Sequence, residues 1–68
     1  MKDHKLQQLR IKLKNLRIKL GWSQEDLARE IGVSLSTIQR WESKKIKPHQ
    51  LARRQLDRLF QEFNIDVE

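Results

Sequence analysis

Residues 21–43 read GWSQEDLAREIGVSLSTIQRWES, and this stretch decides the fold. Ser23 fits the position before a helix, because its hydroxyl can accept a backbone hydrogen bond. Asp26, three residues later, fits the reciprocal partner in a capping box. Gly32 suits a tight turn, since glycine adopts the left-handed conformation without a steric penalty. Ser34 then fits the start of a second helix, so the stretch predicts two short helices joined by a tight turn.

The apolar residues of this stretch fit two short helices that cross at a steep angle. Ala28 is small where the helices would approach most closely, and a larger side chain there would hold them apart. Larger apolar residues fall where the pair would bury them: Leu27, Ile31, Val33, Ile38 and Trp41. Each of these alone is commonly plain core, but their joint spacing is specific. The stretch therefore predicts a helix-turn-helix unit over about residues 24–43.

A helix is expected before this unit, over about residues 5–20. Leucines recur there at spacings of three and four, which is the period of one apolar helix face. They are Leu6, Leu9, Leu13, Leu16 and Leu20. Gly21 would end this helix in the left-handed conformation.

A final helix is expected over about residues 48–63. Pro48 suits its first turn, where a backbone N–H is not needed. One face of this helix would be apolar: Ala52, Leu56, Leu59, Phe60 and Phe63. Asn64 fits a left-handed stop, and no stretch alternates with period two, as a strand would. The sequence thus predicts an all-α fold, a compact bundle of four helices, or of five.

Composition narrows the class of function. The chain has 68 residues and no cysteine, which predicts one domain over residues 1–68 and excludes disulfides and thiolate metal sites. No apolar run is long enough to span a membrane, so we expect a cytoplasmic protein. The net charge of +6 indicates a polyanionic partner. Basic residues gather in residues 1–20 and 44–56, on either side of a mildly acidic middle.

The motif residues resemble the Cro and phage-repressor (XRE-like) helix-turn-helix family over about residues 9–60. The resemblance is carried by Gly21 to Ala28, Ile31 to Ser34, Ile38 to Glu42, and Pro48. It implies a fold of the lambda-repressor-like DNA-binding type. It also implies a DNA-binding transcriptional regulator, commonly dimeric, which we expect to associate with the nucleoid when it binds DNA. Some members are antitoxins of toxin–antitoxin pairs. One residue departs from the pattern: this chain has Lys44 where the family usually has glycine, which leaves the conformation of that turn open.

The third helix is the candidate for reading DNA. At 100° per residue, Ile38 and Trp41 define its buried side. The expected base readers lie on or beside the opposite face: Leu35, Ser36, Gln39 and Arg40. In helix-turn-helix proteins, residues near the start of the second helix contact base edges in the major groove. The alternative is that some of these side chains only solvate the helix.

Phosphate contacts are expected from residues that flank this helix. Gln24 opens the preceding helix, whose free N–H groups favour an anion, and by resemblance this glutamine often binds a phosphate. The full set of expected phosphate contacts is Gln24, Ser34, Ser43, Lys44, Lys45 and Lys47. For Glu42 we expect a structural ion pair or a helix-terminus contact rather than a functional role, with Arg17 as its candidate partner.

The first helix has a second apolar face. Ile11 and Ile18 lie off the leucine stripe, on nearly the opposite side. One interpretation is a contact in a homodimer, formed at least on DNA; the other is scattered surface isoleucine.

Four functions stay open, and catalysis is not one of them. The leading hypothesis is a sequence-specific regulator of double-stranded DNA, acting as a repressor. The alternatives are an antitoxin that also binds a toxin protein, an interaction module without DNA binding, and an anionic-membrane binder, which interleaved lysines disfavour. His4 and His49 lack partners at metal-ligand spacing, so we expect no enzyme activity, metal or cofactor.

Overall fold

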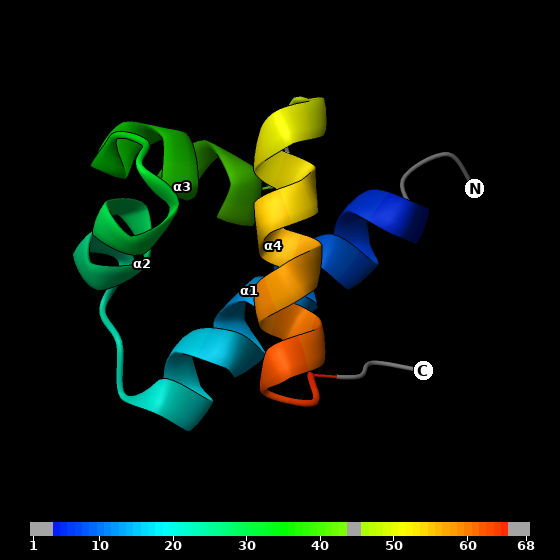
Figure 1. The fold of residues 1–68 in the computed structure, drawn as a ribbon. Helices are drawn as coiled ribbons and strands as arrows, with labels where there is room; N and C mark the ends of the chain where they lie inside the picture. Colours follow the sequence, from blue (N-terminus) through cyan, green and yellow to red (C-terminus); the bar gives the residue numbers. More distant parts are fainter. Residues whose placement is uncertain (1–3, 44–45, 66–68) are drawn as a thin grey trace.

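The computed structural model describes residues 4–43 and 46–65, the side chains of residues 4–6 excepted. This part of the chain is built from helices without strands: α1 (His4–Leu20), α2 (Gln24–Ile31), α3 (Leu35–Glu42) and α4 (Gln50–Glu62). Figure 1 shows α2 and α3 together at one side, while α4 crosses over α1. The all-α prediction is confirmed, with four helices in the described residues.

The leucine stripe of α1 forms the floor of the core. Leu9, Leu13 and Leu16 are buried and Leu20 is partly buried, as their spacing predicts, while the side chain of Leu6 lies outside the described residues. Gly21 ends α1 with φ 71°, in the left-handed region predicted for it.

The start and end of α2 follow the predicted local chemistry. The Ser23 hydroxyl accepts from Asp26 N at 3.1 Å, and the Asp26 carboxylate accepts from Ser23 N at 2.9 Å. Gly32 follows α2 with φ 86°, and its N–H donates to the Ala28 carbonyl at 2.8 Å. The capping box and the left-handed turn are therefore both confirmed.

Ser34 begins α3 as predicted. Its hydroxyl accepts from Thr37 N at 3.2 Å, while its own backbone is extended. Ile38 and Trp41 then turn their side chains into the core, where both are buried.

The start of α4 corrects one prediction. Pro48 was expected in the first turn, but α4 begins at Gln50 and His49 is its N-cap. His49 has an extended backbone, with φ −74° and ψ 172°, which breaks the helical path between Pro48 and Gln50. Its imidazole Nδ1 accepts from Ala52 N at 3.4 Å, so a side chain that is not a preferred cap satisfies this helix end.

The rest of α4 agrees with the sequence. Its buried face is formed by Ala52, Leu56 and Phe60, with Leu59 and Phe63 partly buried. Asn64 ends the helix region with φ 55°, the left-handed stop expected of it.

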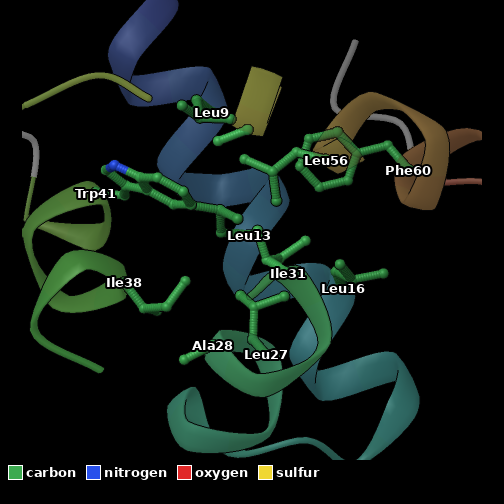
Figure 2. Close-up of a cluster of buried hydrophobic side chains, with 11 residues drawn as sticks. Leu9, Leu13, Leu16, Leu27, Ala28, Ile31, Ile38, Trp41, Leu56 and Phe60 are labelled. Atoms are coloured by element: carbon green, nitrogen blue, oxygen red, sulfur yellow. The ribbon is translucent and has the colours of Figure 1, made fainter. Parts of the chain in front are cut away.

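One apolar cluster joins all four helices. Figure 2 shows the leucines of α1 facing Leu27 and Ile31 of α2, with Ile38 and Trp41 contributed by α3. Ala28 is also buried, in agreement with its expected place at a close helix crossing. This cluster fixes α2 and α3 on α1, and so decides which face of α3 remains outside.

Candidate nucleic-acid interface

The outer face of α3 brings the predicted base readers together. Ser36, Gln39 and Arg40 are exposed, and Leu35 keeps 39% of its surface accessible. They lie on or beside the side opposite Ile38, which is fully buried. The face is polar and can both donate and accept hydrogen bonds, as base-edge recognition requires.

The charge of this face depends on where one carboxylate lies. Glu42 is the only acidic residue of α3, and it is buried, with 6% of its surface exposed. The exposed face therefore carries the positive charge of Arg40 without a neighbouring acid from the same helix. A negatively charged ligand meets no repulsion from α3 itself.

Glu42 is held by a network that joins three elements. Arg17 of α1 donates from Nε to Oε2 at 2.8 Å and from Nη2 to Oε1 at 3.0 Å, a bidentate pair. Gln24 of α2 donates from Nε2 to the same Oε1 at 3.0 Å. Arg17 Nη1 also donates to the Trp22 carbonyl at 3.4 Å. The ion pair predicted for Arg17 and Glu42 is confirmed, and the network fixes the end of α3 against the start of α2.

Gln24 has a structural bond that the sequence did not predict. Its amide nitrogen carries two N–H groups, so the bond to Glu42 leaves one donor for another acceptor. Glu25 and Asp26 follow in the first turn of α2 and oppose an anion there. Hydrogen bonds from the Ser23 backbone N–H and then from its hydroxyl lower the pKa of Asp26, which favours its charged form. A phosphate contact at this helix end would depend on the Gln24 amide rather than on the helix dipole.

The other predicted phosphate contacts are distributed around α3. Ser34 precedes it, and the Ser34 hydroxyl is already engaged in capping. Ser43 follows it, exposed, and its hydroxyl donates to the Arg40 carbonyl at 3.0 Å. Lys47 is exposed in the segment that leads to α4. Lys44 and Lys45 lie outside the described residues.

The predicted dimer residues form an exposed pair on α1. Ile11 keeps 42% of its surface accessible and Ile18 keeps 76%, and both lie away from the leucine stripe. Neither belongs to the apolar cluster that holds the four helices together.

Sequence reasoning overlooked one residue of α1. Arg10 of α1 contributed only to the charge count, yet its Nε is buried without a hydrogen-bond partner. Its position seven residues before Arg17, which puts both on one side of the helix, was the available indication.

The family comparison agrees with this geometry. A helix-turn-helix family model matches residues 13–65, which include α2, α3, α4 and the second half of α1. No curated protein and no solved structure gives a significant match to the chain. In the described residues, no helix has the length and apolar character needed to cross a bilayer. The chain belongs to the helix-turn-helix family of the Cro and phage-repressor (XRE) type, and it is a DNA-binding regulator of that type.

Proposed function

We propose that this protein is a sequence-specific repressor of transcription that inserts α3 into the major groove of double-stranded DNA. The observation that carries the proposal is the outer face of α3. Gln39 and Arg40 are exposed there, while the only acid of the helix, Glu42, is buried in the network with Arg17. In this family architecture, the second helix of the motif enters the groove.

The exposed side chains match particular base edges. Arg40 suits the O6 and N7 acceptors of guanine, and Gln39 suits N6 and N7 of adenine. Leu35 offers an apolar contact for a thymine methyl group. Each good bidentate pair gives about 1–3 kcal/mol of discrimination against the wrong base.

Phosphate contacts would set the register of α3 in the groove. The proposed contacts surround α3 in the sequence: Gln24, Ser34, Ser43, Lys44, Lys45 and Lys47. Such contacts are independent of sequence, and each phosphate neutralised makes binding more sensitive to salt.

We further propose that the protein binds as a homodimer through Ile11 and Ile18. Their exposure, 42% and 76%, supports an apolar contact that the folded monomer does not use. A two-fold dimer predicts DNA half-sites one helical turn apart, about 34–36 Å. Sedimentation of Ile18→Glu against wild type tests this: we expect weaker self-association, and an unchanged dimer would contradict the assignment.

The test of base reading is a selection from random duplex DNA. Wild type should recover a defined motif. Arg40→Ala should lose the preference at one position of each half-site by about 5- to 150-fold, the equivalent of about 1–3 kcal/mol. Arg58→Ala is the matched control, because Arg58 is exposed on α4, beside Glu30 and Ile31 at the end of α2. Unchanged base preference in Arg40→Ala would remove Arg40 from the base readers.

A further inference from the structure

Arg10 of α1 carries a buried polar atom that nothing satisfies. Its Nε is excluded from solvent and has no hydrogen-bond partner, although the residue as a whole stays partly exposed. A charged guanidinium with a buried, unpaired N–H is unfavourable, and such groups in a folded protein call for an explanation.

The position of Arg10 places it on the flank of α1 that faces α3. Arg10 and Arg17 are seven residues apart, so they share one side of the helix at about 10.5 Å along its axis. Arg17 on this flank contacts Glu42 at the end of α3. The opposite flank faces α4, where Lys12 Nζ lies 5.5 Å from the Phe60 ring centre and Lys19 Nζ donates to the Phe63 carbonyl.

No carboxylate in the described chain neutralises Arg10. The sequence of α1 contains no Asp or Glu. Glu42, the only acid of α3, already accepts hydrogen bonds from Arg17 and Gln24. Arg10, unlike Arg17, is therefore left without an ionic partner among the described residues, in a chain whose net charge is +6.

We propose that Arg10 binds a DNA phosphate on the flank of α1 that it shares with Arg17. The proposal rests on the proposed function, since it requires a DNA backbone strand to run along this flank of α1. The buried Nε is out of reach of a ligand, so the phosphate would be held by Nη1 and Nη2, which form a fork for two of its oxygens. Arg10 would thus anchor α1 to that strand, a contact from outside the helix-turn-helix unit.

The test measures how binding depends on salt. The dissociation constant of the duplex recovered by selection is measured over a series of salt concentrations, for wild type, Arg10→Gln and the charge-matched control Arg58→Gln. Arg10→Gln should reduce the slope of log K against log salt by about 0.9, the value for one phosphate, and Arg58→Gln should leave it unchanged. The loss should be equal on a duplex of unrelated sequence, because phosphates carry no sequence information.

Two further measurements separate this role from a structural one. Thermal unfolding of Arg10→Gln should occur at or above the wild-type midpoint, because the substitution removes no hydrogen bond. Arg10→Lys keeps the charge but loses the fork, so it should bind more weakly with the wild-type salt slope. A slope that falls as far in Arg10→Lys as in Arg10→Gln would overturn the proposal.

The remaining outcomes distinguish this proposal from the proposed function. If the wild-type protein binds DNA and Arg10→Gln leaves the salt slope unchanged, the assignment of Arg10 is overturned but the proposed function is not. An unchanged slope with weakened self-association would mean that Arg10 pairs with a carboxylate of a second copy, which also overturns it. A wild-type chain that binds no duplex overturns the proposed function, and this proposal with it.

Discussion

The helix-turn-helix unit and α4 share one apolar cluster, but they differ in the polar interactions that are added to it. In the unit, Ser23 and Ser34 cap α2 and α3 with short side chains, and Glu42 receives three hydrogen bonds at the end of α3. In α4, the cap is a long hydrogen bond that His49 Nδ1 accepts from Ala52 N, and the helix is held mainly by buried apolar residues such as Leu56.

This difference follows from what each region has to do. Hydrogen bonds depend on direction, so the network at Glu42 fixes the orientation of α3 as well as its distance from α1. Apolar burial is non-directional, so it can hold α4 in place without specifying its orientation as narrowly. The helix that has to match a groove is thus the one fixed by directional contacts.

The largest expected effect comes from breaking the network. Arg17→Met leaves Glu42 buried and without its ionic partner, which should lower the free energy of unfolding by about 3–5 kcal/mol. Denaturant unfolding followed by circular dichroism measures it. Arg53→Met is the control, because the Arg53–Asp57 pair is exposed and should contribute at most about 1 kcal/mol. Equal losses of unfolding free energy in Arg17→Met and Arg53→Met would mean that the network at Glu42 contributes no more than an exposed ion pair of α4.

A comparable loss of stability, caused by the removal of apolar burial alone, is expected in α4. Leu56 is fully buried, and Leu56→Ala should cost about 2–5 kcal/mol through lost burial and a cavity. Leu51→Ala in the same helix should change stability by less than about 0.5 kcal/mol, because Leu51 keeps 69% of its surface accessible. Similar losses at both positions would mean that α4 is not held through its buried face.

The weak cap of α4 should be open to improvement. His49→Asp places a short carboxylate at the N-cap and should raise the free energy of unfolding by about 0.5–1 kcal/mol. Ser34→Asp is the matched control, since Ser34 already caps α3 and little can be gained there. A gain at Ser34 as large as that at His49 would contradict the ranking of the two caps.

The smallest effect concerns the pH dependence of the capping box. Hydrogen bonds from Ser23 lower the pKa of Asp26 below its ordinary value of 3.8. The stability that its carboxylate contributes is therefore complete above that value and is lost as the pH falls through the lower pKa of the folded state. The stability difference between wild type and Asp26→Asn should shrink on acidification. A difference that stays constant with pH would argue against the ionised capping box.

Local chemistry made much of the fold predictable. The capping box at Ser23 and the left-handed residues Gly32 and Asn64 depend on neighbours within a few positions, so the sequence contains the whole cause. The exposure of Gln39 and Arg40 follows from helical periodicity once the buried side is known.

The remaining features depend on competition or on packing between helices. Pro48 is a good first residue for a helix, but the extended His49 after it decided where α4 begins. The bond from Gln24 to Glu42 joins residues 18 positions apart, and the burial of Arg10 Nε depends on how α1 packs. Neither has a local sequence pattern, because both arise from the relative placement of helices.

The backbone conformation at Gly21 and Gly32 decides which chirality a replacement residue must have. Both glycines have positive φ, yet a Cβ built on either would meet no atom within 4 Å apart from those of the glycine and its two chain neighbours. Chirality rather than space therefore excludes an ordinary side chain there. A chemically synthesised chain with D-alanine at position 32 should keep the fold and gain stability, since the mirror-image residue favours this conformation and has fewer unfolded states than glycine.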